Sequence, residues 1–202
     1  MIPEPRRVGF FGGAFDPPHR AHQLLAETAC KELNLDELRV IPTGQAWHKE
    51  RSLTTAAHRL AMARLAFAEF ASVQVDPREM ARTGPSYTID TLRELVATQP
   101  DAAFFLIVGA DQAQALTGWH CWQQILEIAT ICVAFRASAA SANTVFDIEK
   151  LFPSQVHRLQ MPEFPLSSTE IRAQIFAGRS VDTLLSKPVA RYIADHHLYQ
   201  TA

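Results

Sequence analysis

Short apolar runs alternate with longer segments of helical periodicity along most of the chain. An apolar run that stops at glycine or proline predicts a buried strand, and apolar residues that recur at three and four predict a helix. The run over 103–108 is almost wholly apolar, which is typical of a strand buried on both faces of a parallel sheet. We predict strands over 8–11, 37–42, 72–75, 103–108, 130–135 and 156–159, and helices over 21–33, 55–70, 86–98, 122–129, 167–178 and 188–197.

This alternation predicts the fold class. The strand–helix–strand unit over 8–42 is expected to form two parallel strands joined by a right-handed crossover. Because there is no internal repeat and no long linker, residues 1–202 are expected to form a single α/β domain, a doubly wound Rossmann-like fold with a mostly parallel sheet. The C-terminal helical part, about 166–199, is expected to pack on it, and 137–144 to form a surface loop. Ligands of such sheets bind at the carboxyl ends of the strands.

Composition narrows the classes of partner. The 202 residues carry a formal net charge of −2, which provides no positive field for nucleic acid or for an anionic membrane, so we expect neither as a partner. No apolar run approaches membrane-spanning length and the first residues lack the core of a signal peptide, so we expect a cytoplasmic protein. The widely spaced Cys30, Cys121 and Cys132 predict mostly buried thiols rather than disulfides or a zinc site. The sequence leaves open whether the chain forms a homo-oligomer.

Candidate chemistry begins with GFFGGAFDPPHRAHQ at residues 9–23, where the first predicted strand ends. Gly12 and Gly13 allow a phosphate to approach the backbone N–H groups. His19 and His22 share one helical face at a helix start, where anions are favoured. The spacing is neither GxGxxG nor a P-loop. From these residues alone, a phosphate site, a glycine turn with two incidental histidines and a zinc site without a third ligand all remain open.

A second motif, LSSTEIR, lies at residues 166–172. Ser167 or Ser168 is a good helix N-cap, with Glu170 early in the helix and Arg172 one turn in. Capping alone explains the serines, whereas an arginine at this place can also face an anion held by the helix N-terminus. The two roles can coexist in one helix start.

Both motifs resemble signatures of the nucleotidyltransferase superfamily. GGAFDPPHRAH is similar to GGTFDPxHxGH, whose HxGH is related to the HIGH motif of class I aminoacyl-tRNA synthetases, and LSSTEIR is similar to ISSTxIR, which grips the β- and γ-phosphates of ATP. Ala14 replaces the usual Thr and Ala21 the usual Gly, and both replacements are small. The resemblance implies the nucleotidyltransferase type of fold and an ATP site formed by Gly12, Gly13, Ala14, Phe15, His19, His22, Gly109, Asp111, Ser167, Ser168, Thr169 and Arg172.

Further segments narrow the resemblance to the bacterial nicotinate-nucleotide adenylyltransferases. They are IPTGQAWHK at 41–49, TGPSYTIDTL at 83–92, VGADQAQALTGWHCWQQIL at 108–126 and KPVARYIADHHLY at 187–199. The resemblance covers roughly residues 8–199, and Trp47 departs from it because the family usually has Pro there. It implies a nicotinate-mononucleotide site formed by Thr43, His48, Lys49, Tyr87, Thr88, Trp119 and Arg136.

The resemblance also implies roles within these sites. Trp119 is expected to stack on the pyridine ring, and the backbone N–H groups of Tyr87 and Thr88 to bind its carboxylate at a helix N-terminus. Asp111 is expected to accept hydrogen bonds from ribose hydroxyls, and Lys49 to reach a phosphate. The ordinary alternatives are a core or rim tryptophan, a helix N-cap for the aspartate and a solvated loop for the lysine.

The implied reaction transfers AMP from ATP to nicotinate mononucleotide, giving deamido-NAD and pyrophosphate in NAD biosynthesis. The implied catalytic residues are His19, His22, Lys49 and Arg172. Since the attacking phosphate oxygen is already anionic, positioning and charge neutralisation suffice, with Mg²⁺ carried by the ATP phosphates and few or no protein ligands to it. The alternatives are an acceptor that is nicotinamide mononucleotide or both mononucleotides, and a non-catalytic nucleotide-binding protein, which Ala14 and Ala21 leave open.

Overall fold

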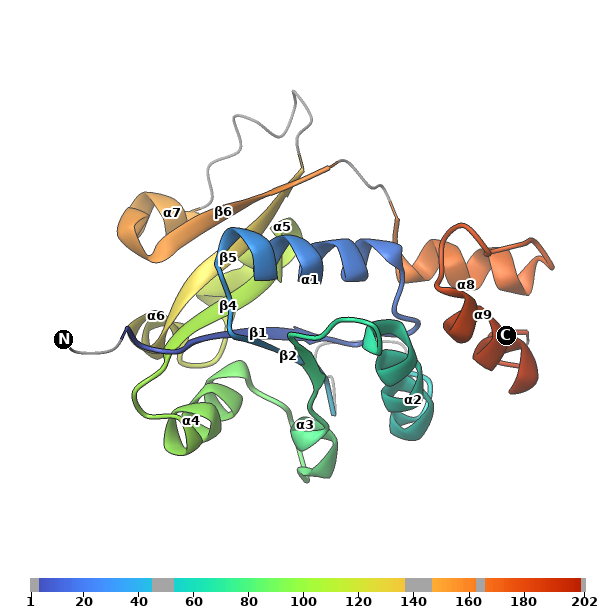
Figure 1. Ribbon diagram of the computed structural model, residues 1–202, viewed down its shortest axis with the longest axis horizontal. Coiled ribbons are helices and arrows are strands. Elements are labelled where there is room, and N and C mark those ends of the chain that lie inside the picture. The colour runs from blue at the N-terminus through green and yellow to red at the C-terminus, as the bar shows by residue number, and fades with distance from the viewer. Residues whose placement is uncertain (1–3, 45–52, 137–146, 163–165, 201–202) are drawn as a thin grey trace.

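The computed structural model describes residues 4–44, 53–136, 147–162 and 166–200, and its centre is a six-stranded sheet (Figure 1). All strand pairs in these ranges are parallel, in the order β3-β2-β1-β4-β5-β6. The order reverses between β1 and β4, so the carboxyl ends of these two strands form the topological switch point. The strands are β1 (Arg7–Gly13), β2 (Glu37–Pro42), β3 (Val73–Val75), β4 (Ala103–Gly109), β5 (Ala129–Arg136) and β6 (Val156–Met161).

Helices cover both faces of the sheet. Within the described ranges they are α1 (Arg20–Glu32), α2 (Ala56–Phe67), α3 (Arg78–Ala81), α4 (Thr88–Thr98), α5 (Ala110–Ala115), α6 (Trp122–Ile128), α7 (Asp147–Leu151), α8 (Ser168–Phe176) and α9 (Lys187–Asp195). The predicted strands and helices are all present, with ends that differ by up to three residues. The sequence did not predict α3, α5 and α7, because four to six residues are too few to display a helical period. None of the helices described is long and apolar enough to cross a bilayer.

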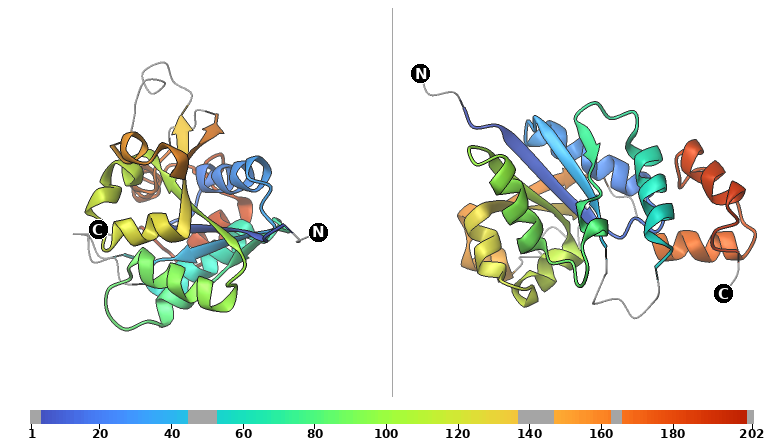
Figure 2. Two further views of the ribbon diagram at one scale, coloured as in Figure 1. Left: turned by 90° about the vertical axis from the view of Figure 1, so that its left-hand side faces the viewer. Right: turned by 90° about the horizontal axis from the view of Figure 1, so that it is seen from below.

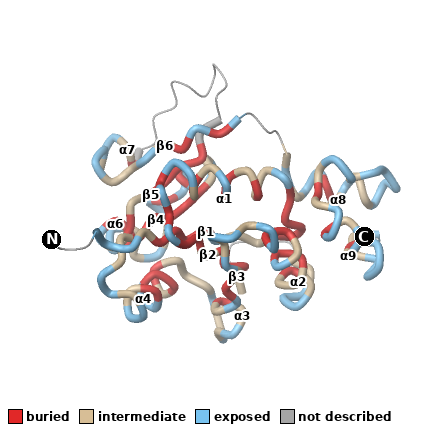
Figure 3. Tube along the Cα trace, in the orientation of Figure 1, coloured by how far each residue is buried: buried red, intermediate tan, exposed pale blue. Residues whose placement is uncertain are grey.

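The sheet separates two apolar layers. Successive residues of β4 alternate between them: Phe105 and Ile107 belong to one layer, and Phe104, Leu106 and Val108 to the other. Helices α1, α2, α8 and α9 contribute to the first layer, and α4, α5, α6 and α7 to the second. Figure 1 shows α1 and α4 on opposite sides of the sheet, and Figure 3 shows that burial follows the strands between them. This arrangement confirms the predicted doubly wound α/β fold with a parallel sheet.

The C-terminal helices pack beside α2. Ile171 of α8 and Val189 and Ile193 of α9 are buried in the same layer as Met62 and Phe67 of α2. Figures 1 and 2 show α8 and α9 at the end of the molecule opposite α6 and α7. The packing brings the start of α8 next to the turn that follows β1, as the hydrogen bonds described below show.

Pairing between the two central strands stops before the strands end. β1 pairs with β2 as far as Gly13 and Pro42, whereas its pairing with β4 ends at Phe11 and Ile107. The backbones beyond this point are free to separate, and they do so at the switch point. The residues that follow, which are Gly12 and Gly13 on β1 and Val108 and Gly109 on β4, all line one cavity.

The three cysteines differ in burial. Cys132 lies within β5 and is fully buried, and burial raises the pKa of its thiol to about 12. Cys30 and Cys121 are intermediate in burial and pack at the margins of the two apolar layers, and all three are free thiols. The expectation of mostly buried thiols is therefore confirmed.

Candidate active site

A cavity of about 730 Å³ lies at the switch point. It brings together segments that are far apart in the sequence: the ends of β1 and β4, the start of α1, the start of α4, α5 and the start of α8. This is the place that a doubly wound sheet provides for a ligand. Of the residues predicted for the site, Gly12, Gly13, Ala14, His19, His22, Thr43, Thr88, Gly109, Asp111, Trp119, Ser167 and Ser168 line it.

The two histidines form a stacked pair at the start of α1. His19 is the N-cap residue and His22 is the third residue of the helix, and their ring centroids lie 3.7 Å apart with 22° between the planes. The His19 backbone N–H donates to Nδ1 of His22 over 3.2 Å. Because Nδ1 accepts this bond, the neutral His22 ring carries its proton on Nε2. His22 lines the cavity, so Nε2–H is the donor that it offers there.

His19 is the more buried of the pair. It is 5% exposed, and burial lowers the pKa of its imidazole to about 4. In the part of the chain that the structure describes, Nδ1 of His19 has no hydrogen-bond partner. A buried polar atom without a partner carries a free-energy cost that a ligand can remove by bonding to it. His19 is thus neutral at pH 7 in the unliganded site and ready to bind a polar group.

Phe15 packs its ring against His22 of the histidine pair. Its ring is 1% exposed and lies 5.1 Å from the His22 ring at an angle of 65°. Its backbone has a φ of +49°, which turns the chain sharply after the strand. A Cβ atom on Gly13 would lie 3.1 Å from the Phe15 ring, so the glycine makes room for it. The side chain of Phe15 lies in the core, while its neighbour Ala14 lines the cavity; any contact of Phe15 with ATP stays a prediction.

The start of α8 is fastened to the turn after β1. Ser168 Oγ donates to the Pro17 carbonyl over 2.9 Å, and Arg172 Nη1 donates to the Asp16 carbonyl over 2.7 Å. Arg172 Nη2 also donates to Thr169 Oγ1 over 3.0 Å, so both predicted residues orient one another. These bonds bring the two sequence motifs, about 150 residues apart, to one end of the cavity.

The two serines of the motif have different roles: Ser167 caps α8, whereas Ser168 bonds to the turn after β1. Ser167 is the N-cap of α8, and its hydroxyl oxygen accepts from the Glu170 backbone N–H over 3.2 Å. The Glu170 carboxylate accepts in return from the Ser167 backbone N–H over 3.0 Å. The capping role and a role at the cavity therefore coexist in this helix start, since Ser167 and Ser168 also line the cavity.

Arg59 is a buried residue of the site region that sequence reasoning missed. Its guanidinium is 2% exposed and donates to four backbone carbonyls, those of Ala14, Thr43, Gly44 and Thr54, over 2.7–3.2 Å. Burial lowers its pKa, and the nearby Asp16 opposes that shift. The guanidinium thus ties the turn after β1 to the end of β2 and the start of α2. An arginine inside the apolar α2 segment AAHRLAMARLAF was the available signal.

The other end of the cavity is formed by the start of α4. Tyr87 is the N-cap of this helix, and Thr88, its first residue, lines the cavity. The first N–H groups of a helix have no intrahelical acceptor and favour an anion. The Tyr87 ring packs against the ring of His120, with centroids 4.6 Å apart, a contact that the sequence did not predict. The helix start is therefore held against the α5–α6 connection.

Trp119 and Asp111 come from the segment after β4. Trp119 lines the cavity and also packs on the second apolar layer, so the predicted stacking face and the ordinary rim position coincide. Asp111 lies in the first turn of α5, whose N-cap is Gly109. The alternative that Asp111 is itself the N-cap is therefore wrong, and its carboxylate lines the cavity.

Glu79 is a second buried residue that the sequence did not single out. It is 5% exposed, lines the cavity and accepts a hydrogen bond from Thr91 Oγ1 over 2.7 Å. Burial raises the pKa of Glu79, and the bond from Thr91 and the charge of Arg82 oppose that shift. Arg82 donates to Thr91 over 2.9 Å and to Glu94 over 2.9 Å.

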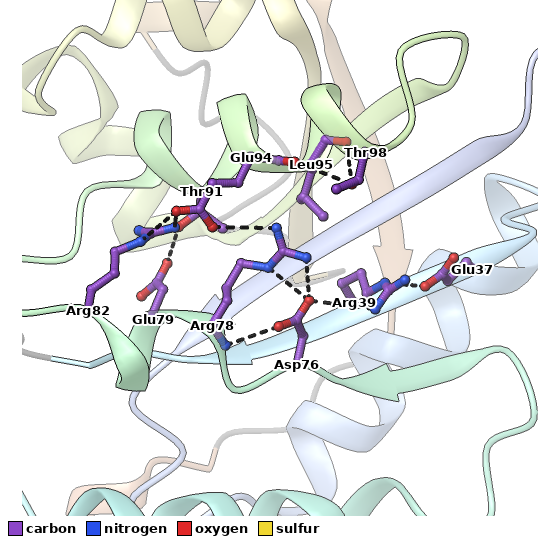
Figure 4. A network of polar contacts seen from close by, with 10 residues as sticks. All are labelled: Glu37, Arg39, Asp76, Arg78, Glu79, Arg82, Thr91, Glu94, Leu95 and Thr98. Carbon is purple, nitrogen blue, oxygen red and sulfur yellow. Dashed lines mark hydrogen bonds and ion pairs between the residues drawn. The ribbon is translucent and has the colours of Figure 1, made fainter.

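Figure 4 shows that this group continues into a ladder of alternating charges that joins α4, α3, Asp76 just after β3, and β2. Arg78 pairs with both Glu94 and Asp76, and Arg39 pairs with Asp76 and Glu37. A Cβ atom on Gly44 would overlap the Glu79 carbonyl oxygen, so α3 packs directly on the backbone that follows β2. The ladder fixes the wall that carries Thr88.

Three predicted residues lie beyond what the structure describes. His48 and Lys49, with Trp47, fall in 45–52, outside the described residues. Arg136 is the last residue of β5, and its side chain is also outside the description. Their predicted roles stay predictions. Within the described ranges, no group of three or more His, Cys, Asp or Glu side chains could hold a metal ion.

Comparison with known proteins identifies the family. Residues 10–174 match the family described as cytidylyltransferase-like. A protein of Albidiferax ferrireducens named "Probable nicotinate-nucleotide adenylyltransferase" is 60% identical over 197 residues, which cover 98% of this chain and 100% of that protein. A protein of the same name from Methylibium petroleiphilum is 43% identical over 198 residues, covering 96% and 92%. The chain belongs to the cytidylyltransferase-like family, as a relative of nicotinate-nucleotide adenylyltransferases.

Solved structures give this member of the cytidylyltransferase-like family the same fold. Plasmodium falciparum nicotinic acid mononucleotide adenylyltransferase complexed with APC is 18% identical and superposes with a TM-score of 0.79, covering 98% of each chain. The same protein complexed with NaAD is 19% identical, with a TM-score of 0.78 and the same coverage. The fold that the sequence motifs imply is thereby confirmed.

The buried His19 predicts a pH dependence of stability. Its folded pKa of about 4 lies below the value of 6.5 for an ordinary histidine. Between these values the unfolded chain binds more protons, so the free energy of unfolding falls as the pH drops through this window, by about 3 kcal/mol from this group. We expect His19→Asn to flatten the pH dependence of the urea-unfolding free energy between pH 6.5 and 4. The exposed His157 gives the control, because His157→Asn should leave the slope unchanged; an unchanged slope in His19→Asn would contradict the assignment.

Proposed function

We propose that the protein transfers the adenylyl group of ATP to the 5′-phosphate of nicotinate mononucleotide, giving nicotinate adenine dinucleotide and pyrophosphate. The names of the close relatives support this reaction. The observation that carries it is a single cavity with two differently equipped ends. One end has the histidine pair and the start of α8, and the other has the start of α4 and Trp119.

The histidine end suits the triphosphate of ATP. Two helix N-termini, those of α1 and α8, meet there with the glycine backbone that ends β1, and each favours an anion. His19 and His22 add imidazole groups within the same wall. Arg172, held one turn inside α8, adds a cation near the turn. Asp111, which lines the cavity, is the group that we assign to ribose hydroxyls.

The α4 end suits the pyridine ring and its carboxylate. Trp119 offers an aromatic face to a flat, electron-poor ring. The N–H groups of Tyr87 and Thr88 at the start of α4 are donors only, which matches a carboxylate that only accepts hydrogen bonds. The NH₂ group of an amide would place a donor against these donors. This donor set favours nicotinate over nicotinamide mononucleotide.

Adenylyl transfer needs little acid–base chemistry from the protein. An oxygen of the mononucleotide phosphate forms a bond to the α-phosphorus of ATP, and the bond from that phosphorus to the bridging oxygen breaks as pyrophosphate leaves. The attacking oxygen is already anionic, so the protein positions the two phosphates and stabilises the charge that moves to the leaving group. His22, whose Nδ1 accepts from the His19 backbone N–H, can donate from Nε2–H to a phosphate oxygen, and we assign Lys49 to the same task.

A magnesium ion would enter with ATP, held by the ATP phosphates. Mg²⁺ keeps most of its waters when it binds phosphate oxygens, so the cavity needs to supply few or no ligands, and Asp111 stays available to the ribose hydroxyls. When bound, the ion neutralises phosphate charge. Glu79, the other cavity carboxylate, already accepts from Thr91, so it has a structural task.

Pyrophosphate release tests the proposed reaction. With Mg-ATP present, nicotinate mononucleotide, nicotinamide mononucleotide and phosphopantetheine are supplied in turn as acceptors. We expect kcat/KM for the first to exceed that for the second by about 10-fold or more, because charge-assisted hydrogen bonds to the carboxylate are lost with the amide. Phosphopantetheine should give no release above background.

The other outcomes are equally definite. Equal release with the two mononucleotides would keep the reaction and refute the selection of the carboxylate. Failure of every acceptor, from folded protein that still binds ATP in a calorimetric titration, would refute the reaction in favour of a nucleotide-binding protein without turnover.

His22 is the residue whose loss should most directly affect the charge on the phosphates. His22→Ala removes the Nε2–H donor at the phosphate end, so kcat should fall by about 100-fold or more while the fold is retained. Steady-state kinetics and circular dichroism measure the two effects. The exposed His157 again provides the control, since His157→Ala should keep wild-type turnover. Near-normal turnover in His22→Ala would refute its catalytic role.

Trp119 should act on one substrate only. Trp119→Ala removes the stacking face, so KM for nicotinate mononucleotide should rise by about 10-fold while KM for ATP changes by less than about twofold. Trp122 is a matched control, because it packs against Phe152 on the outer side of the same segment. Trp122→Ala should leave both KM values unchanged. Equal increases of both KM values in Trp119→Ala would mean that Trp119 is structural.

A further inference from the structure

The segment after α9 reaches back to the turn that carries the histidines. The Tyr199 hydroxyl lies 2.7 Å from Oδ1 of Asp16, a residue 183 positions away in the sequence. Asp16 is 1% exposed and Tyr199 is half-buried, with Met62 Sδ 3.9 Å from the same hydroxyl. Hydrogen bonds to a carboxylate are stronger and shorter than those between neutral groups. This hydrogen bond therefore connects the C-terminal segment to the turn after β1.

The backbone is bent to bring Tyr199 to this place. His197 and Tyr199 have φ angles of +51° and +65°, in the left-handed region that residues other than glycine rarely adopt. Such conformations persist where surrounding contacts fix them. Here the Leu198 N–H donates to the Ile193 carbonyl over 3.0 Å, and Leu198 packs against the core beside α9. The packing of the segment thus fixes the direction of the Tyr199 side chain.

Tyr199 is the donor of the bond. Burial and the neighbouring Asp16 raise the pKa of Tyr199 above its ordinary value. The phenol therefore keeps its proton at every pH at which the protein would be assayed. Asp16 accepts, and the geometry does not depend on titration of the tyrosine.

Asp16 passes this restraint to the histidine turn. Its Oδ2 accepts from the Thr54 backbone N–H over 3.3 Å, and its carbonyl accepts from Arg172 over 2.7 Å. Two prolines separate it from His19, and their fixed φ angles leave little backbone freedom between the two residues. Asp16 thus joins the Tyr199 hydroxyl to a backbone that continues through the two prolines to the N-cap of α1.

We propose that Tyr199 is a positioning residue for adenylyl transfer, which through its bond to Asp16 holds His19 and His22 in register with the phosphates. The proposal rests on the proposed function. Tyr199 acts through Asp16, so its loss should affect the step in which charge moves to the leaving group rather than the binding of the pyridine end.

Tyr192 provides a matched control on the same C-terminal segment. Its hydroxyl lies 2.9 Å from Nδ1 of His58, on the α2–α9 contact and not on the histidine turn. Tyr192→Phe therefore removes one tyrosine hydrogen bond and leaves Asp16 untouched. Any loss of stability common to both tyrosine variants is subtracted by this comparison.

The test compares Tyr199→Phe with Tyr192→Phe in the full chain, with kcat, both KM values and the thermal midpoint as readouts. We expect Tyr199→Phe to lower kcat by about 10-fold, with KM for nicotinate mononucleotide within about twofold of wild type. Tyr192→Phe should keep the wild-type kcat. Unchanged kcat in Tyr199→Phe, or an equal fall in both variants, would overturn the proposal.

A double-mutant cycle tests whether Tyr199 acts on the histidine turn through Asp16. If Tyr199 acts through Asp16, adding Tyr199→Phe to Asp16→Ala should lower kcat by less than about twofold further. A full further 10-fold fall would overturn the proposal. If Asp16→Ala does not fold, the comparison of the two tyrosine variants decides alone.

A readout independent of turnover separates this proposal from the proposed reaction. ¹⁵N resonances of the His19 and His22 imidazoles should shift in Tyr199→Phe and stay in place in Tyr192→Phe. Wild-type protein that releases no pyrophosphate with any acceptor would refute the reaction, and the imidazole resonances would still report whether Tyr199 holds the turn. Unshifted resonances in Tyr199→Phe would overturn the positioning role.

Discussion

The pairing between β1 and β4 stops before either strand ends, and this determines the position of the site. Hydrogen bonding between these strands stops at Phe11 and Ile107, although both strands continue for two residues. β1 remains paired with β2, and β4 with β5, as far as the ends of these strands, so the backbones can separate only between β1 and β4. The starts of α1 and α5 then lie on either side of the opening, and α4 and α8 complete its rim. The site that we propose holds two nucleotides and therefore needs an extended opening, which the strand register provides.

The backbone of the turn after β1 is held by side chains that come from other parts of the sequence. Its carbonyls accept from Arg59, Arg172 and Ser168, which lie on α2 and α8. Carbonyl oxygens satisfy the donors of a guanidinium without cancelling its charge as a carboxylate would. The two guanidinium groups lie at the turn together with the buried carboxylate of Asp16, which offsets part of their positive charge. Their hydrogen bonds fix the backbone of a segment that we assign to phosphate binding.

The sequence predicted those parts of the molecule that local patterns encode. Each strand had an apolar run, α1 had a helical period, α2 was rich in Ala and Leu, and the two motifs lay at helix starts, as found. Short helices such as α3 and α5 lacked enough residues for a period. Arg59 and Glu79 were missed because their partners are set by tertiary packing: Arg59 reaches Ala14 across 45 positions. The same reason hides Tyr199, whose local sequence reads only as the end of a helix. The burial of the Phe15 ring was also not predicted, because it follows from a left-handed backbone that no local pattern encodes; its contact with ATP stays a prediction.

The residues around the cavity pack in two different hydrophobic layers, one on each side of the sheet. Phe15, Leu25, Leu166 and Tyr199 pack in the layer of α1, α2, α8 and α9, which supports the histidine end. Tyr87, Trp119 and Ala113 pack in the layer of α4, α5 and α6, which supports the end that we assign to the pyridine ring. Side chains in one layer are screened from those in the other by the strands. Substitutions that reshape the pocket for the acceptor can therefore accumulate in one layer without repacking the layer under the reacting phosphates. Such a molecule can change its choice of acceptor in evolution while it keeps its chemistry.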